Sequence, residues 1–254
     1  MRGRARVAAA ACAAVVALAL GTGACASGSA AGGETTLTVL AAASLTETLN
    51  AAKPAYEREH PGVKPRFSFA GSQELAAQVR QGAPADVIAT ADERTMSGLG
   101  DDVTKPSVFA TNRLRIAVAP GNPKRVRGLA DLTRKDLTVV LAAPTVPAGR
   151  YARQALGRAG VNVAPRSEEK DVKSVVTRIR LGEADAGIVY GSDVAAAGKA
   201  VSGVAIPDAQ NVTARYPVAV VSTTEHREHA QALVTWMSSP AFRKELTARG
   251  FGTP

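Results

Sequence analysis

Cysteine is almost absent from this chain of 254 residues. Its two cysteines, Cys12 and Cys25, lie near the N-terminus and are too few to form a disulfide framework or a structural zinc site. Long hydrophobic runs are also missing, which excludes a membrane protein with several spanning helices. The 23 glycines and 14 prolines are scattered, which excludes collagen-like and low-complexity chains. The remaining composition is that of an ordinary globular protein.

Acidic residues are fewer than basic ones, and the formal net charge is +9. Three of these positive charges belong to arginines among the first six residues. No block of lysine and arginine with interleaved aromatic residues occurs, whereas a nucleic-acid surface needs such a basic cluster or stripe. We therefore expect a mildly basic, solvated surface and no nucleic-acid partner.

The first 25 residues are typical of a secretory signal peptide. Arg2, Arg4 and Arg6 precede an uncharged run at residues 7–20, and small residues follow it. That run is shorter than the roughly 18–20 residues that a membrane-spanning helix needs. The sequence predicts an exported protein in which residues 1–25 are the signal and residues 26–33 (ASGSAAGG) are a flexible tether.

The processing site has two interpretations. Gly23, Ala24 and Cys25 resemble a lipobox, in which the cysteine is lipid-modified and becomes the new N-terminus, although Thr22 stands where that pattern prefers an aliphatic residue. Residues 24–26 also fit the A-x-A site of plain secretion. The tether favours the first interpretation, a lipoprotein held by Cys25 at the extracytoplasmic face of the cell membrane.

The rest of the chain alternates between strand and helix patterns. Alternation of this kind predicts an α/β fold with mainly parallel sheets covered by helices. Pro65 indicates that its strand lies at a sheet edge. Strands are predicted at residues 36–41, 63–70, 85–90, 114–119, 137–142, 186–190 and 216–221. Helices are predicted to begin at Ser44 and Ser72, which we expect to act as N-caps, after residues 147–149, after Asp171 as a further cap, and at residue 230.

Small and hydroxyl residues recur where these strands end and helices begin. Ligands of open α/β sheets bind at the carboxyl ends of strands, where the free N–H groups and positive dipole ends of helices favour anions. Ser44 and Ser72 are placed in this way, and Tyr190 ends a strand. Each residue alone is more typical of a cap or of the core, so spacing by itself does not establish a site.

Known catalytic patterns are missing. No G-x-S-x-G elbow occurs, and residues 226–229 read H-R-E-H rather than the H-E-x-x-H of a zinc protease. The segment 191–199 lacks the spacing of a phosphate-binding P-loop. We therefore expect a protein that is not an enzyme.

A series of short motifs, taken in order, resembles the periplasmic molybdate-binding proteins of ABC transporters. VPAG followed by GIVYGSD is the most specific part, and the resemblance extends from about residue 36 to residue 251. The motifs are AAASLT (41–46), FAGS (69–72), GAPADV (82–87) with Ala91-Asp92, VPAGRYA (146–152), Asp171-Val172, GIVYGSD (187–193), YPVAV (216–220) and RGF (249–251).

The resemblance implies a two-lobed periplasmic-binding-protein fold with a hinge that the chain crosses twice. Lobe 1 would comprise residues 34–112 plus 215–254, and lobe 2 residues 113–214. The crossings would lie near Asn112-Arg113 and near Arg215-Tyr216.

The resemblance also implies a ligand, molybdate or tungstate, and no other cofactor. The metal would be bound as its oxyanion, with no direct metal ligand from the protein. Gly71 stands where the family often has serine. Carried over position by position, the oxyanion-binding residues are Ser44, Ser72, Ala148, Val172 and Tyr190.

The implied function is capture of the oxyanion outside the cytoplasm and its delivery to an ABC permease, by a protein expected to be a monomer. Several alternatives remain at this point. The ligand could be another anion such as sulfate, phosphate or an organic anion, or ferric iron. A sensory or scaffold lipoprotein that keeps the fold without transport is a further interpretation.

Overall fold

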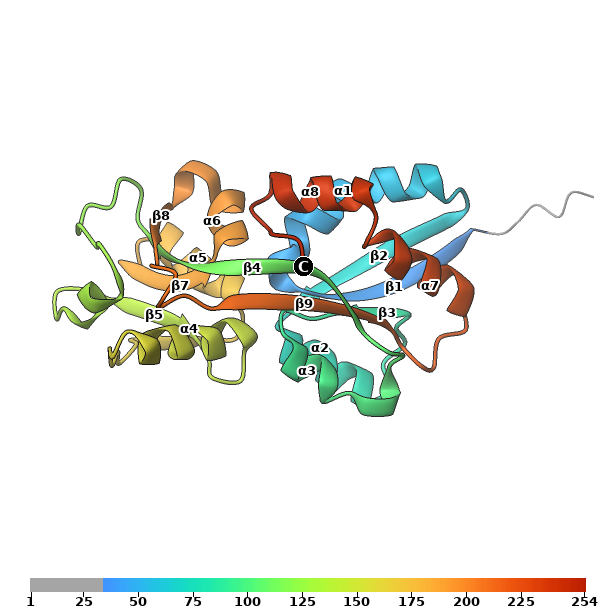
Figure 1. Cartoon of the computed structure of the whole chain (residues 1–254), viewed down its shortest axis with the longest axis horizontal. Coiled ribbons are helices and arrows are strands. Elements are labelled where there is room, and N and C mark those ends of the chain that lie inside the picture. The colour runs from blue at the N-terminus through green and yellow to red at the C-terminus, as the bar shows by residue number, and fades with distance from the viewer. Residues whose placement is uncertain (1–33) are drawn as a thin grey trace, which may run out of the picture. The chain divides into compact units, whose positions relative to one another are not determined.

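Strands and helices alternate along most of residues 34–254, which are the residues that the computed structural model describes (Figure 1). The predicted α/β class is confirmed. The strands are β1 (Thr35–Ala42), β2 (Val63–Ala70), β3 (Val87–Ala89), β4 (Ser107–Val118), β5 (Val139–Ala142), β6 (Ser167–Glu169), β7 (Ala186–Tyr190), β8 (Ser202–Ala205) and β9 (Thr213–Val220). The helices are α1 (Thr46–Glu59), α2 (Ser72–Arg80), α3 (Glu93–Ser97), α4 (Pro147–Arg158), α5 (Val172–Arg180), α6 (Gly191–Ala197), α7 (Arg227–Trp236) and α8 (Pro240–Ala248).

The sheet has parallel strands toward both ends and antiparallel strands in the middle. Its order is β2-β1-β3-β9-β4-β7-β5-β6, with β8 paired to β4. Strand β1 is parallel to β2 and β3, and β5 is parallel to β6 and β7, whereas β4 and β9 run antiparallel to their neighbours. Strand β2 is an edge strand, as Pro65 predicted.

Strand β4 joins the two parallel sets because it changes partner along its length. Residues 107–113 pair with β9, residues 114–118 pair with β7, and residues 115–118 also pair with β8. We call β1–β3 with α1–α3, α7 and α8 the β1 group, and β5–β8 with α4–α6 the β5 group. The change of partner falls where the sequence predicts the first crossing. The division into lobes at these residues stays a prediction, since the described residues belong to one compact unit.

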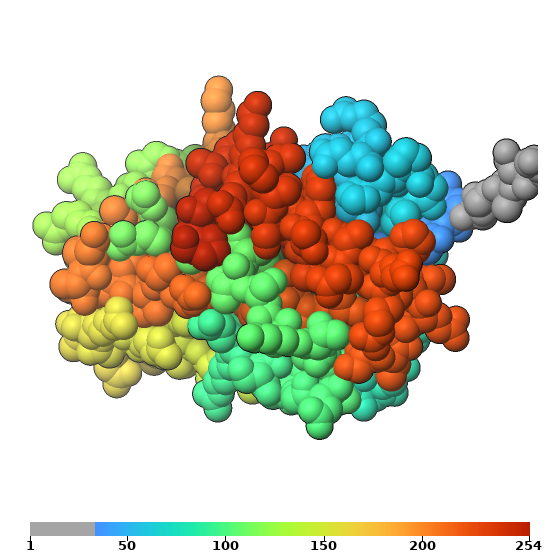
Figure 2. Space-filling model, turned by 45° about the vertical axis from the view of Figure 1, so that its right-hand side comes forward, coloured from blue at the N-terminus to red at the C-terminus, as the bar shows by residue number. Residues whose placement is uncertain are grey.

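Helices cover both faces of the sheet. Val39 and Leu40 are neighbours on β1 but belong to different core clusters, because successive side chains of a strand point to opposite faces. Leu40 packs with residues of α2 and α3, and Val39 packs on the side of α1. Helix α8 contacts α1, so the end of the chain (red) lies beside its early residues (cyan) on the face seen in Figure 2.

Several elements differ from the sequence prediction. Strand β4 begins at Ser107 rather than at residue 114, because residues 107–113 pair with β9. Strand β6 (SEE) is polar and three residues long, and β8, α3 and α6 are short, so none of them carries enough periodic residues to be recognised. The strand at 186–190 and the helix start after Asp171 are confirmed, and the Asp171 side chain accepts a hydrogen bond from the amide of Ser174 (2.7 Å).

Candidate functional site

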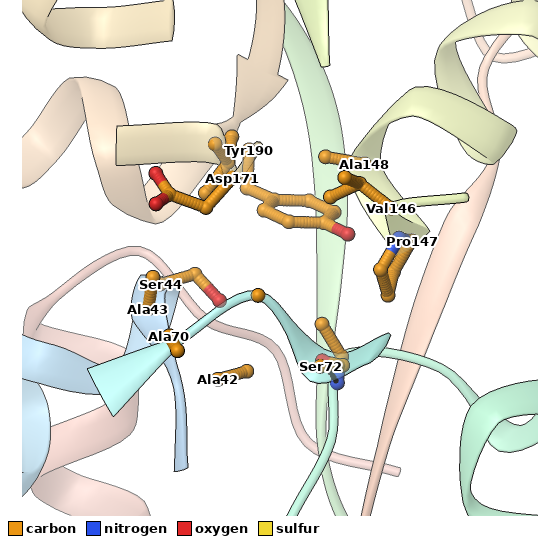
Figure 3. A pocket seen from close by; sticks show the side chains of 13 residues that line it. Ala42, Ala43, Ser44, Ala70, Ser72, Val146, Pro147, Ala148, Asp171 and Tyr190 are labelled. Atoms are coloured by element: carbon orange, nitrogen blue, oxygen red, sulfur yellow. Dashed lines mark hydrogen bonds between the residues drawn. The ribbon is translucent and has the colours of Figure 1, made fainter. Parts of the chain in front are cut away.

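One pocket between the β1 group and the β5 group gathers the five residues that the resemblance assigned. Each of the five is at most 4% exposed. The cavity volume of the pocket is about 10 Å³, far below the roughly 300–1,000 Å³ of sites for drug-sized ligands. It therefore suits a small ion better than an organic metabolite. The lining consists of Ala42, Ala43, Ser44, Ala70, Gly71, Ser72, Ala91, Val146, Pro147, Ala148, Asp171, Val172 and Tyr190 (Figure 3).

Helix starts from both groups converge on this pocket. Helix α2 begins at Ser72 in the β1 group, and α4 and α5 begin at Pro147 and Val172 in the β5 group. The amide N–H groups of the first turn have no acceptor within their own helix, and the N-terminal end carries a partial positive charge. The pocket is thus lined by N–H donors that are suited to an anion.

The start of α4 is held close to the end of β5 by Gly149. A Cβ at this position would lie 2.1 Å from the carbonyl oxygen of Ala143 and 2.3 Å from that of Ala142. Only glycine permits this approach. Pro147 occupies the first helical position and has no N–H, so the amide of Ala148 is the first donor that α4 presents.

Neither serine caps its helix, contrary to the sequence prediction. Ser44 lies inside a 3-10 turn (Ala43–Leu45), and its Oγ is 2.9 Å from the Oη of Tyr216. Ser72 is the first residue of α2 after Gly71, and its Oγ accepts a hydrogen bond from the amide of Ala91 (3.0 Å). The acceptor role leaves the Ser72 hydroxyl hydrogen available for a ligand. The hydroxyl of Ser44 is equally available when Tyr216 is the donor of their shared bond.

The Tyr190 hydroxyl is buried and has no hydrogen-bond partner within the described residues. Figure 3 shows it on the same side as Ala148 and Pro147. Burial raises the pKa of Tyr190 well above its ordinary value of 10, with smaller contributions from nearby acidic and tyrosine side chains. The phenol therefore stays protonated and can donate. Leaving a buried donor unpaired costs about 1–3 kcal/mol, which a ligand oxygen would recover.

The pocket lining contains one ionisable acid and, among the described residues, no lysine, arginine or histidine. The acid is Asp171, whose carboxylate caps α5 and in Figure 3 lies on the opposite side from the Tyr190 hydroxyl. The guanidinium of Arg150, two residues beyond Ala148, forms an ion pair with Asp92. The groups directed at the pocket are thus mainly neutral donors.

Sequence reasoning missed the residues that support the site. Tyr216 does not line the pocket, but it holds Ser44 and is fully buried, and burial raises its pKa well above 10. Ala91 supplies the amide that holds Ser72. Both residues lie in motifs that carry the family resemblance, and this was the one signal that could have pointed to them. The contact of Tyr216 with Ser44 joins residues 172 positions apart, so no local sequence pattern predicts it.

Three remaining questions concern membrane-spanning helices, metal ligands and the predicted lipidation site. Within residues 34–254 no helix is long and apolar enough to span a bilayer, and no group of three or more His, Cys, Asp or Glu residues is arranged to hold a metal ion. Cys25, the predicted lipidation site, lies outside the described residues, as do the signal peptide and the tether.

Comparisons with known proteins place the chain in a family and identify structures with the same fold. The family described as bacterial extracellular solute-binding protein matches residues 37–252. The chain is 39% identical over 229 residues to the molybdate-binding protein ModA of Mycobacterium tuberculosis, covering 87% of this chain and 86% of that one. Among solved structures, the periplasmic molybdate-binding protein of Azotobacter vinelandii has a TM-score of 0.74 at 21% identity, covering 86% of this chain and 99% of the other. The sulfate-binding protein SubI of M. tuberculosis has a TM-score of 0.75 at 24% identity, covering 85% and 86%.

Proposed function

The chain belongs to the bacterial extracellular solute-binding proteins, and from this membership we propose that it captures molybdate, and also tungstate, for delivery to the permease of an ABC transporter. The relative named as molybdate-binding is 39% identical over most of both chains. The observation that carries the proposal is the buried hydroxyl of Tyr190, which has no hydrogen-bond partner among residues 34–254 and lies in a small pocket onto which several helix starts converge.

The oxyanion would be held by neutral donors from both groups. Ser44 and Ser72 would offer hydroxyl and amide hydrogens, Ala148 and Val172 their amides, and Tyr190 its phenol. A hydrogen bond to a charged partner contributes about 1.5–3 kcal/mol, so roughly half a dozen of them offset much of the cost of removing a dianion from water. The positive ends of the helices add to this stabilisation without a lysine or arginine in contact with the ligand.

Selectivity follows from the kind of donors and from their spacing. Apart from the Asp171 carboxylate, which caps α5 on the opposite side from the Tyr190 hydroxyl, the groups directed at the pocket are mainly donors. A protonated anion such as hydrogen phosphate is therefore disfavoured, because its O–H would lack an acceptor among them. Sulfate has the same charge and shape as molybdate but is smaller. Donors fixed by helices and strands would stand too far from its oxygens, so size separates the two. Sulfate remains the competing candidate because a sulfate-binding protein shares the fold.

The ligand would be bound and released unchanged, outside the cytoplasm, by a monomer that is not an enzyme. We propose anchoring through a lipid on Cys25, with cleavage after Ala26 as the alternative. Mass spectrometry of the mature N-terminus distinguishes a lipid-modified Cys25 from a free N-terminus that follows Ala26.

Alanine variants of the two serines test the binding proposal. Ser44→Ala and Ser72→Ala should each weaken molybdate binding, measured by calorimetry, whereas Ser97→Ala on the exposed side of α3 should not change it. Unchanged affinity in both pocket variants would refute the site.

A further inference from the structure

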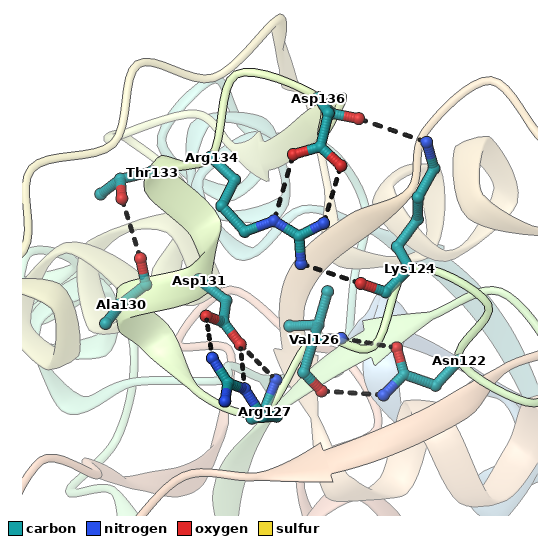
Figure 4. A network of polar contacts seen from close by, with 9 residues as sticks. All are labelled: Asn122, Lys124, Val126, Arg127, Ala130, Asp131, Thr133, Arg134 and Asp136. Atoms are coloured by element: carbon teal, nitrogen blue, oxygen red, sulfur yellow. Dashed lines mark hydrogen bonds and ion pairs between the residues drawn. The ribbon is translucent and has the colours of Figure 1, made fainter.

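Three polar bridges join the β1 group to the β5 group beside the pocket. Several other ion pairs connect near neighbours in the sequence, as in the exposed loop shown in Figure 4, where Arg127 pairs with Asp131 and Arg134 with Asp136. Long-range pairs also start on β4 (Arg113 to Asp208) and on β9 (Arg215 to Glu93), but these strands belong to neither group. The three bridges instead connect residues 58 to 126 positions apart. They are Arg150 to Asp92, Lys173 to Glu47, and the Gln73 side chain to the carbonyl oxygen of Lys170.

Arg150 makes the most buried bridge. Its Nε lies 3.0 Å from Oδ2 of Asp92, its Nη2 also contacts that oxygen, and its Nη2 lies 2.8 Å from Oγ1 of Thr95. The Arg150 and Asp92 side chains are 17% and 4% exposed. Asp92 is fixed in turn, because its Oδ1 caps α3 at the amide of Thr95 (2.9 Å). A guanidinium on α4 is therefore held by an ordered carboxylate of the opposite group.

Lys173 makes the second bridge, from the first turn of α5. Its Nζ lies 2.7 Å from Oε2 of Glu47 on α1 and 3.5 Å from Oδ1 of Asp193, whose side chain is fully buried in the β5 group. The lysine thus links a buried acid of its own group to an acid of the other. The Lys173 and Glu47 side chains are 26% and 44% exposed, so this bridge is more strongly screened than the first.

Gln73 makes the third bridge, and Gly71 makes room for it. The Nε2 of Gln73 donates to the carbonyl oxygen of Lys170 at 2.9 Å. A Cβ on Gly71 would lie 2.4 Å from that nitrogen and 2.8 Å from that carbonyl oxygen. The backbone of the β1 group therefore approaches the β5 group at Gly71 more closely than a side chain there would allow.

We propose that the three bridges form a clasp that holds the two groups together over the ligand, with Asp92, Arg150, Glu47 and Lys173 as positioning residues that set affinity without touching the oxyanion. This inference rests on the proposed function of the pocket. Each bridge has a residue within three positions of a residue proposed to bind the oxyanion. Gln73 follows Ser72, and Lys173 follows Val172. Arg150 is two residues beyond Ala148, and Glu47 is three residues beyond Ser44. Bridges that form only when the groups are together add their free energy to ligand binding.

Neutralising the two acids distinguishes a clasp from simple electrostatics. Asp92 and Glu47 are negative charges that repel an anion in the pocket. If only long-range electrostatics mattered, removing either charge should therefore tighten oxyanion binding. A clasp predicts the opposite. Asp92→Asn should weaken molybdate binding at least about tenfold, because the asparagine amide can still cap α3 but cannot pair with the guanidinium. Glu47→Gln, at a more exposed pair, should weaken binding about two- to fivefold.

A matched control is available on the same helix. Glu57 of α1 pairs with Lys53 and Lys64, all within the β1 group. Glu57→Gln removes the same charge and an ion pair of similar kind, but no bridge between the groups. Its molybdate affinity should equal that of the unmodified protein. Thermal unfolding of each variant confirms that it is folded.

Small-angle X-ray scattering without added oxyanion tests the clasp independently of which ligand the pocket binds. The variant with both Asp92→Asn and Glu47→Gln should have a larger radius of gyration than the unmodified protein, and Glu57→Gln should not. If molybdate fails to bind the unmodified protein but this difference appears, the ligand assignment is wrong and the clasp stands. If molybdate binds the unmodified protein, and Asp92→Asn and Glu47→Gln bind it as tightly as Glu57→Gln or more tightly, the clasp is wrong.

Discussion

The hydroxyl of Ser44 lies 2.9 Å from the hydroxyl of Tyr216, a residue on β9 that does not line the pocket. Both side chains are buried, and the ring of Tyr216 also meets that of Tyr190 edge-on at 5.8 Å between centroids. Two of the proposed donors are therefore set by one tyrosine on a strand that connects the two groups. We therefore expect affinity for the oxyanion to depend on Tyr216, although this residue does not line the pocket.

Tyr216→Phe tests that dependence. Loss of the hydroxyl frees Ser44 to rotate away from the pocket, and a neutral hydrogen bond of this kind contributes about 0.5–1.5 kcal/mol. We expect molybdate affinity measured by calorimetry to fall about two- to tenfold. Tyr56→Phe is the control, since Tyr56 is equally buried but lies on α1 away from the pocket, and its hydroxyl has no hydrogen-bond partner among the described residues. Equal affinities in the two variants would contradict the role of Tyr216.

Tyr190→Phe separates a ligand donor from a structural residue. The hydroxyl has no partner among the described residues, so its removal should leave the free energy of unfolding without ligand unchanged or slightly higher. Molybdate affinity should fall by about 1.5–3 kcal/mol, the contribution of a hydrogen bond to a charged group. Denaturant unfolding and calorimetry measure the two quantities. A stability loss with unchanged affinity would assign Tyr190 to the fold instead.

Gly149→Ala should disrupt the start of α4. Its Cβ would approach the carbonyl oxygens of Ala142 and Ala143 to within 2.3 Å, so the helix has to shift and the amide of Ala148 moves with it. We expect lower stability and loss of molybdate binding. Gly157→Ala on the same helix has no atom within 4 Å of the added carbon and should stabilise the protein by up to about 1 kcal/mol. Similar behaviour of the two variants in thermal unfolding would contradict the close approach.

Asp193 predicts a pH dependence of stability. Burial raises the pKa of Asp193 from 3.8 to about 6, against the lowering effect of Lys173 and of the Tyr190 amide. The folded protein therefore holds this proton at pH values where the unfolded chain has released it. The contribution of Asp193 to stability is greatest below about pH 4 and is lost as pH rises through 6.

Asp193→Asn removes this dependence. The difference in unfolding free energy between the unmodified protein and the variant should shift in favour of the variant from pH 4.5 to pH 7.5, by an amount of order 1–3 kcal/mol. Denaturant unfolding at the two pH values measures it. A constant difference across this range would mean that the carboxyl group ionises normally in the folded protein.

The sequence pattern was sufficient for the fold class, and the resemblance brought five residues that line one pocket, whose role as ligands stays a prediction. Neither was sufficient for the residues that support the pocket. Strands such as residues 186–190 and the helix after Asp171 carry a clear local pattern, and they form as predicted. The roles of Ser44 and Ser72 as caps were wrong, because their hydroxyls bind partners on other strands and loops. The ion pair of Arg150 with Asp92 was not foreseen, since a charge on a helix surface gives no indication of a partner 58 positions away.

Parallel calorimetric titrations of the purified protein with molybdate, tungstate and sulfate test the central claim most directly. The claim is that neutral donors at fixed positions select a doubly charged tetrahedral oxyanion by its size. We expect saturable binding of molybdate and tungstate with similar affinities, competition between the two for one site, and far weaker binding of sulfate. Binding of sulfate as tight as that of molybdate, or no heat with either metalate, would contradict the account.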